Sequence, residues 1–205
     1  MTFEIWLAFV AASAVVLAIP GPTILLVIGQ SLGAGRRGAL PLVAGVALGD
    51  LTAMTLSLAG LGAVLATSAT AFTIVKWLGA AYLVWLGVSL WRAKVPEQDA
   101  AAVALPAIRA MRDAYVVTAL NPKSIAFFVA FVPQFIVAGA AFAPQAAILI
   151  ATFVVMAAAN AALYALLAGQ LAGAVRRPAV RRFVNRAGGT MLIGAGVATA
   201  AMRRA

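Results

Sequence analysis

Long apolar runs alternate with short polar or basic segments along the whole chain. The first run lies between Glu4 and Arg36, which enclose no charged residue. A helix of about 20 mostly apolar residues is long enough to cross a bilayer. We therefore expect six membrane-spanning helices, over residues about 5–30, 39–66, 71–91, 114–137, 144–172 and 187–202. The first run lacks the basic start and short apolar centre of a secretory signal, so we expect it to remain in the protein.

The composition agrees with a membrane protein, since 65% of the 205 residues are hydrophobic and only 10% are charged. The interpretation of the net charge of +10 depends on where along the chain the basic residues lie. Most of them fall in the loops after the first, third and fifth spans. By the positive-inside rule these loops are cytoplasmic, so we expect both termini outside, contact with membrane lipid and no nucleic-acid partner. The loop residues are Arg36, Arg37, Arg92, Lys94, Arg109, Arg112, Arg176, Arg177, Arg181, Arg182 and Arg186.

Cysteine and histidine are both absent from the chain. Their absence excludes disulfides, thiolate chemistry and the commonest general base and metal ligand. A Ser–Lys pair would need Lys123 and Ser124, but adjacent residues on a helix do not face each other. A single deep carboxylate without histidine also suits a metal ion poorly. We expect no enzyme, no metal site and no cofactor. Export of a divalent metal or other small cation, and then an intramembrane enzyme, stay as alternatives.

The third and sixth expected spans resemble each other at a constant shift along the sequence. Three helices form an odd-numbered repeat, so a second copy must enter the membrane in the opposite orientation, as in many transporters. We therefore expect an all-α membrane protein with a single transmembrane domain over 1–205. Its two inverted three-helix repeats would cover about 1–92 and about 113–205, joined by a cytoplasmic linker of about 93–112. The matched residues are Gly79, Leu83, Gly87 and Val88 with Gly188, Leu192, Gly196 and Val197.

Two of these spans, the first and the fourth, carry helix-breaking sequences, Pro20-Gly21-Pro22 and Asn121-Pro122-Lys123. Proline breaks or kinks a helix, and in hydrocarbon such breaks persist only where protein or a wet cavity surrounds them. Pro22 and Pro122 suit the first position of new half-helices, whose N-termini attract carboxylates. Because the repeats are inverted, we expect the breaks to meet near the midplane, with Thr23 and Ser124 just beyond them.

Asp50 and Lys123 are the charges that lie deepest in the expected spans. A charge at a helix centre in the membrane costs about 2.5–3.5 kcal/mol on insertion scales and is a functional candidate. Either the two form a structural ion pair, or Asp50 holds a proton or a substrate ammonium while Lys123 binds a carboxylate. Asn160 is a further candidate for substrate binding, and Gln134 is either a helix-end group or part of an exit path.

Together these motifs resemble the LysE/RhtB family of amino-acid exporters over essentially the whole chain. The resemblance implies a bacterial inner-membrane protein that expels an amino acid, such as lysine, threonine, homoserine or leucine, or a related small metabolite. It also implies coupling to the proton-motive force and no cofactor. A homodimer formed through the glycine stripes is a further expectation. The motifs are Pro20-Gly21-Pro22, Gly45-Val46-Ala47-Leu48-Gly49-Asp50, Lys76-Trp77-Leu78-Gly79-Ala80-Ala81-Tyr82-Leu83, Asn121-Pro122-Lys123-Ser124 and Pro133-Gln134-Phe135.

Overall fold

The computed structural model describes residues 1–34, 38–67, 69–93, 105–137, 139–170 and 177–201, which form helices and no strands. Several basic loop residues, among them Arg36, Arg37, Lys94 and Arg176, lie outside the described residues. The elements are α1 (Phe3–Ala18), α2 (Pro22–Ala34), α3 (Ala39–Thr67), α4 (Ala69–Arg92), α5 (Ala107–Ala119), α6 (Pro122–Ala126), η2 (Phe127–Phe131), η3 (Val132–Phe135), α7 (Phe142–Leu166) and α9 (Pro178–Ala201).

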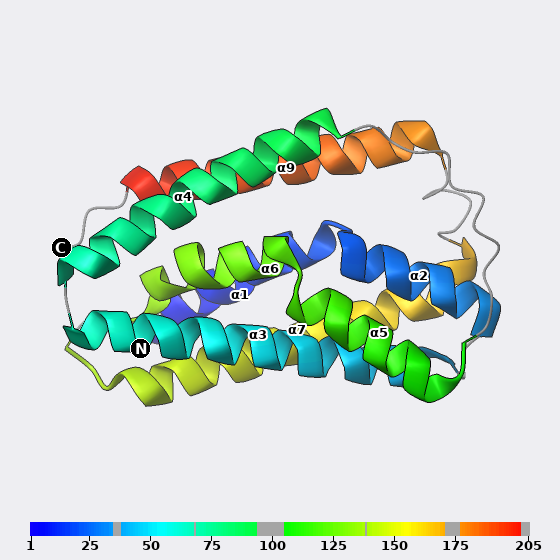
Figure 1. Ribbon diagram of the computed structural model, residues 1–205, viewed down its shortest axis with the longest axis horizontal. Coiled ribbons are helices and arrows are strands. Elements are labelled where there is room, and N and C mark those ends of the chain that lie inside the picture. The colour runs from blue at the N-terminus through cyan, green and yellow to red at the C-terminus, as the bar shows by residue number, and fades with distance from the viewer. Residues whose placement is uncertain (35–37, 68, 94–104, 138, 171–176, 202–205) are drawn as a thin grey trace.

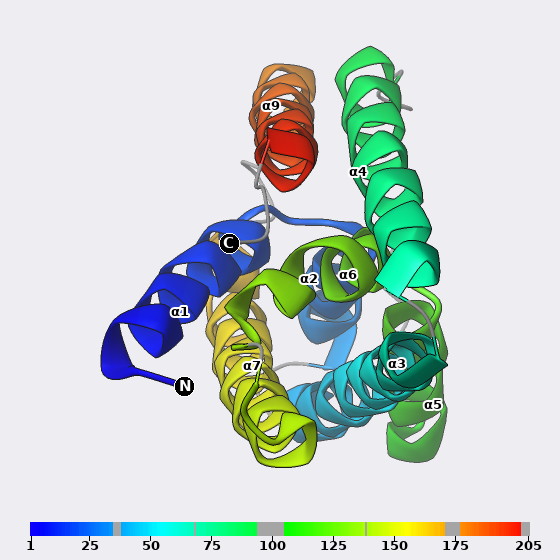
Figure 2. The same ribbon diagram turned by 90° about the vertical axis from the view of Figure 1, so that its left-hand side faces the viewer.

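The helices lie side by side along one long axis (Figure 1). α1 and α2 together run from one end of the bundle to the other, and α3 returns alongside them. The start of α1 and the end of α9 lie at the same end, whereas α2, α4 and α7 all finish at the opposite end (Figure 1). Viewed along the bundle, α4 and α9 form a pair to one side of the remaining helices (Figure 2).

Three helices are long and apolar enough to cross a membrane alone, and a fourth span is obtained if the bent pair of α1 and α2 counts as one. These agree with the expected first, second, fourth and fifth spans. The third and sixth expected spans correspond to α4 and α9. Among the described residues, a shorter apolar helix of α4 covers Trp77–Ser89, and α9 has three arginines in its first turns. The chain is thus an all-α membrane protein, and its six spans stay a prediction.

Both expected helix breaks are present. α1 ends at Ala18, and the chain bends by 56° before α2 begins at Pro22. α5 ends at Ala119, and α6 begins at Pro122. The two proline-led helices therefore start where the sequence predicts them, because proline at the first helical position loses no hydrogen bond.

The fourth expected span is longer and less regular than the sequence suggests. Its helix starts at Ala107, within the stretch expected to be a linker. Beyond α6 the chain forms the π-helical turn η2 and then the 3-10 turn η3, which contains Pro133. Proline has no N–H to donate, so the α-helical hydrogen-bond pattern cannot continue through it. Single π-helical turns inside helices are frequent at functional sites.

Close helix contacts in the bundle depend on glycine. A Cβ atom built on Gly49 would lie 2.7 Å from the Cβ of Thr118 and 2.8 Å from the carbonyl oxygen of Tyr115, so α3 and α5 pack backbone to backbone. On the other side, a Cβ on Gly87 of α4 would lie 2.6 Å from the carbonyl oxygen of Gly189 in α9. Small residues allow such close approach in membrane proteins. The pair of α4 and α9 is also the pair whose sequences resemble each other.

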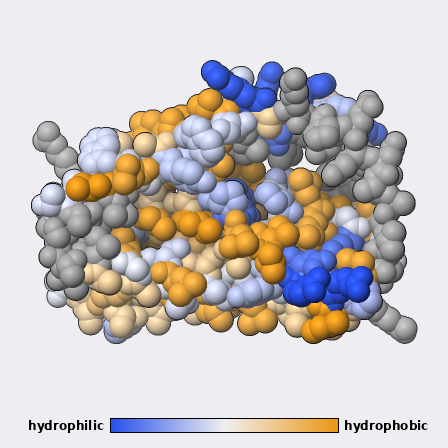
Figure 3. All heavy atoms as spheres, in the orientation of Figure 1, coloured by the Kyte–Doolittle hydropathy of each residue, from blue (hydrophilic) through white to orange (hydrophobic). Residues whose placement is uncertain are grey.

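Apolar side chains cover much of the described surface on the face that Figure 3 shows. Many large hydrophobic side chains are exposed, including Leu56, Leu78 and Trp85, which are 60–68% exposed. Hydrophilic residues gather near one end of the bundle, over the beginning of α5 and the end of α4 (Figure 3). α2, α4 and α7 also end at this end of the bundle (Figure 1).

We predict that Gly45→Val destabilises the protein, because a Cβ at this position would lie 2.8 Å from the Cβ of Ala114 in α5. Gly60→Val is the matched control, since a Cβ at Gly60 of the same helix meets nothing within 4 Å. Thermal unfolding in detergent measures the difference. Equal melting temperatures for the two variants would contradict the close packing of α3 on α5.

Candidate functional site

The end of α1 is held by the side chain of Lys123. The last carbonyls of a helix have no partner inside it, and in a membrane protein water is not at hand to replace them. The Nζ of Lys123 donates hydrogen bonds to the carbonyl oxygens of Val16 at 3.1 Å and Ile19 at 2.9 Å. Lys123 lies at the second helix break, so a side chain from this break provides the hydrogen-bond donors for the end of the helix at the first break.

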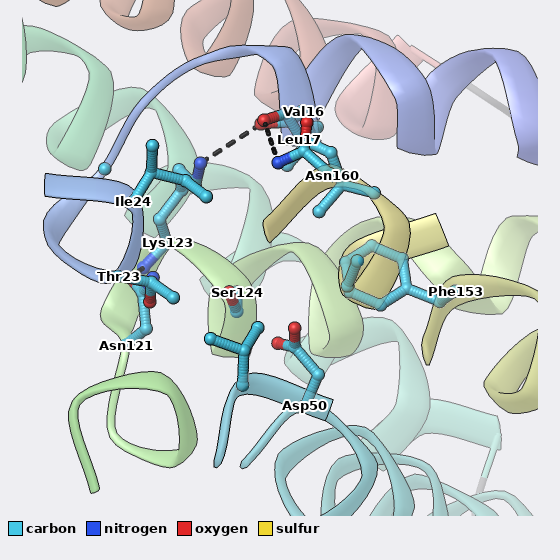
Figure 4. A pocket seen from close by; sticks show the side chains of 13 residues that line it. Val16, Leu17, Thr23, Ile24, Asp50, Asn121, Lys123, Ser124, Phe153 and Asn160 are labelled. Atoms are coloured by element: carbon cyan, nitrogen blue, oxygen red, sulfur yellow. Dashed lines mark hydrogen bonds between the residues drawn. The ribbon is translucent and has the colours of Figure 1, made fainter. Parts of the chain in front are cut away.

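Two side chains of α7 satisfy the remaining carbonyls of this turn. The Nδ2 of Asn160 donates to the carbonyl oxygen of Leu17 at 3.1 Å, and the hydroxyl of Tyr164 donates to that of Ala18 at 3.0 Å. Asn160 and Tyr164 are four residues apart and therefore lie on the same face of α7. Figure 4 shows Asn160 and Lys123 reaching the end of α1 from different elements.

Hydrogen bonds also join the two breaks through Thr23. Asn121 is the N-cap of α6, and its side-chain oxygen accepts from the backbone N–H of Lys123 at 3.0 Å. Its Nδ2 donates to Thr23 Oγ1 at 3.2 Å, and the hydroxyl of Thr118 donates to the same oxygen at 3.3 Å. Thr23 lies in the first turn of α2, so the starts of the two proline-led helices lie side by side.

Asp50 of α3 faces the same cavity as Lys123 (Figure 4) and is only 3% exposed. Its Oδ1 is buried and has no hydrogen-bond partner. No ion pair joins Asp50 to Lys123, and the salt bridge found among the described residues is that of Arg112 with Asp113 at 3.1 Å. The site thus holds a cation bound by carbonyls and a separate carboxylate with an unused oxygen.

These groups surround a polar cavity of about 30 Å³. Such a volume holds about two water molecules, because one water needs roughly 10–15 Å³ by this measure. The lining residues are Val16, Leu17, Gly21, Thr23, Ile24, Val46, Asp50, Asn121, Lys123, Ser124, Phe153, Ala157 and Asn160.

Seven of the residues singled out in the sequence line this cavity: Gly21, Thr23, Asp50, Asn121, Lys123, Ser124 and Asn160. Pro20, Pro22 and Pro122 do not line it; they shape the breaks that border it. Gln134 lies in η3, away from the cavity, where its Nε2 donates to the carbonyl oxygen of Ala130 at 3.2 Å. Its role in an exit path stays a prediction.

Two residues of the site escaped the sequence analysis. Tyr164 and Thr118 are uncharged, and a tyrosine or threonine near a helix end is common at a membrane surface. The signal that could have found Tyr164 is its spacing of four residues from Asn160. For Thr118 it is the spacing of three residues from Asn121.

No group of three or more acidic side chains, in the part of the chain that the structure describes, gathers where it could hold a metal ion. Asp50 therefore lacks the further carboxylate ligands that Mg²⁺ or Ca²⁺ commonly takes in proteins.

An all-helical membrane protein with two apposed helix breaks and a charged internal cavity is typical of transporters. Comparison with known proteins agrees. Residues 14–203 match the family described as LysE type translocator. The chain belongs to this family, whose members are translocators and not enzymes.

Several relatives share most of the chain. An uncharacterized membrane protein of Vibrio cholerae is 35% identical over 198 residues, which cover 96% of this chain and 97% of that protein. A homoserine/homoserine lactone efflux protein of Salmonella typhimurium is 34% identical, covering 98% of each. A leucine efflux protein of an Enterobacter species is 38% identical over 133 residues, 64% of this chain and 63% of that protein. No solved structure matches the chain.

We predict that Lys123→Met destabilises the protein more than Tyr164→Phe. The first substitution leaves the carbonyls of Val16 and Ile19 without a donor, whereas the second leaves only that of Ala18. Each unsatisfied buried carbonyl costs about 1–3 kcal/mol. Thermal unfolding of both purified variants measures the order, and a smaller effect of Lys123→Met would contradict its role in closing the break.

Proposed function

We propose that this protein exports an amino acid from the cytoplasm in exchange for an inward proton. The observation that carries the proposal is the separation of Lys123 and Asp50 within one buried cavity. A zwitterion needs one positive and one negative partner, and two charges that do not neutralise each other supply both. The names of two relatives, a homoserine and a leucine efflux protein, support an amino acid as the substrate.

The substrate carboxylate binds at Lys123. An ammonium carries three donors, and the carbonyls of Val16 and Ile19 take two of them. The third donor is left for a carboxylate, and a charge-assisted hydrogen bond is about twice as strong as a neutral one. The start of α2 at Pro22, with Thr23, adds a positive helix end beside it.

The substrate ammonium binds at Asp50, because the other acceptors of the site are already used. The carbonyls at the end of α1 bind Lys123, Asn160 and Tyr164, whereas Asp50 Oδ1 has no partner. The same carboxylate binds the proton on the return step. Since one carboxylate cannot hold a proton and an ammonium together, the two occupants exclude each other, and this exclusion makes the exchange obligatory.

Alternating access follows from the size of the cavity. Because about 30 Å³ is too small for an amino acid, the cavity must open, first to the cytoplasm and then to the outside. The bend between α1 and α2 and the irregular turns η2 and η3 are where the helices can hinge. We propose that two inverted three-helix repeats, over about 1–92 and about 113–205, rock around this site as part of six membrane spans. Asn160 and Ser124 line this cavity and would contact the substrate there.

We further propose that the protein lies in the bacterial inner membrane with both termini outside. α2, α4 and α7 end at the same end of the bundle. The sequence segments that follow these helices contain most of the basic residues, so the positive-inside rule assigns that end to the cytoplasm.

Export of a divalent metal is the second candidate, but the site favours it less. One buried carboxylate without nearby acidic partners offers few ligands. The chain also places a cation, Lys123, in the same cavity, where it would repel a metal ion. Metal resistance conferred by overexpression, with unchanged excretion of amino acids, would reverse this ranking.

We predict that Asp50→Asn abolishes accumulation driven by a pH gradient. Inside-out membrane vesicles with an acidic interior should accumulate labelled leucine or homoserine, up to about tenfold per pH unit for one proton per zwitterion. The variant cannot hold a proton and should reach equilibrium only. Asp113→Asn is the matched control, since Asp113 pairs with Arg112 at the surface. Accumulation by Asp50→Asn that still follows the pH gradient would show that another group carries the proton.

The orientation gives a separate prediction, and the absence of cysteine makes it simple to test. Thr2→Cys places a thiol before α1, and Arg109→Cys places one in the exposed first turn of α5. A membrane-impermeant maleimide should label Thr2→Cys in intact spheroplasts and Arg109→Cys only after permeabilisation. The reverse pattern would place the termini in the cytoplasm.

A further inference from the structure

A second cavity, of about 430 Å³, lies on the other side of Lys123. Its walls come from α1, α4, η2 and α9, in the region where Figure 2 shows the pair α4 and α9 standing apart from α1. The two proposed charge contacts do not use this space. Cavities of 300–1,000 Å³ are the size of small-molecule binding sites, so its volume is sufficient for any amino-acid side chain.

The chemistry of this second cavity is uniform. Apart from Lys123, every described residue that lines it is apolar, including Leu83 of α4, Phe127 and Phe131 of η2, and Met191 of α9. Among the residues that the structure describes, no hydroxyl, amide or carboxylate side chain lines it. A polar group placed there would lose its hydrogen bonds with water and gain none.

Lys123 and Val16 line both cavities, so the two spaces are neighbours that share the Lys123 side chain. On one side of Lys123 lies Asp50 in the small polar cavity, and on the other lies only apolar surface. A ligand that matches both sides has a charged head and a bulky apolar tail. An α-amino acid with a large hydrocarbon or aromatic side chain has this shape.

We propose that the apolar cavity receives the side chain of the exported amino acid and that the protein selects large apolar amino acids such as leucine, methionine and phenylalanine. This inference rests on the proposed function. The cavity offers no hydrogen bond to the hydroxyl of homoserine or threonine and no carboxylate to the ammonium of lysine. Burial of a leucine-sized side chain favours binding by about tenfold or more over a side chain that stays small.

Gly194 of α9 provides a way to fill this cavity. It lines the cavity, and a Cβ built on it meets nothing within 4 Å, so a larger side chain has room to enter. Gly194→Leu should therefore occupy the space proposed for the substrate side chain without displacing a neighbour. Gly60→Leu is the matched control, because Gly60 is equally open but lines neither cavity. Ala12→Leu fills the same cavity from α1 and covers the case in which Gly194→Leu fails to fold.

The test is counterflow exchange in proteoliposomes loaded with unlabelled amino acid. Wild type should exchange labelled leucine and phenylalanine at least tenfold faster, at low concentration, than homoserine, threonine or lysine. Gly194→Leu or Ala12→Leu should lower leucine exchange at least tenfold while leaving alanine exchange close to that of wild type. Gly60→Leu should behave as wild type toward both substrates.

Exchange of homoserine or lysine at the rate of leucine would overturn the assignment of the cavity. So would a leucine-to-alanine ratio that neither cavity-filling variant changes, as expected if lipid chains occupy the space. In both cases exchange itself persists, and the proposed amino-acid export stands. Absence of exchange for every amino acid, with folded protein in the vesicles, would instead overturn the proposed function and this inference with it.

Discussion

A helix that ends inside a membrane protein must find donors for its last carbonyls, and the site is organised around this requirement. α1 stops at Ala18 because Pro20-Gly21-Pro22 cannot continue it. The donors come from Lys123 of α6 and from Asn160 and Tyr164 of α7. The interrupted helix α1 is therefore bound by side chains from α6 and α7, and the ammonium group of Lys123 is held in the interior without forming an ion pair with Asp50.

The consequence is an interior with separated charges. Carbonyl oxygens stabilise Lys123 through partial charges only, so its full positive charge remains available to an anion. Asp50 keeps a buried oxygen without a hydrogen-bond partner. With a small polar cavity on one side of Lys123 and a large apolar one on the other, the interior has the polarity pattern of an amphipathic zwitterion. Because the small cavity cannot hold a whole amino acid, the proposed export couples substrate binding to a conformational change.

The features that follow from local chemistry could be predicted from the sequence. Proline affects the helix in which it lies, so the helix starts at Pro22 and Pro122 could be predicted. Polar residues inside apolar spans avoid lipid, so a common internal cavity for them could also be predicted. Features that depend on packing could not be predicted. Tyr164 and Thr118 bind groups far away in the sequence, and neither has a charge to mark it. The start of α5 at Ala107 could not be predicted from hydropathy, because the basic residues of its first turns resemble a loop. Basic residues do not prevent helical hydrogen bonding, so the helix includes them.

The most direct test of this account is a structure of the protein with a bound amino acid, determined by electron cryomicroscopy at a resolution that shows side chains. The account predicts the substrate carboxylate within hydrogen-bond distance of Lys123 Nζ, the ammonium at Asp50 and a wider cavity between them. A substrate bound elsewhere in the bundle, while Lys123 keeps its bonds to Val16 and Ile19 and touches no ligand, would contradict it.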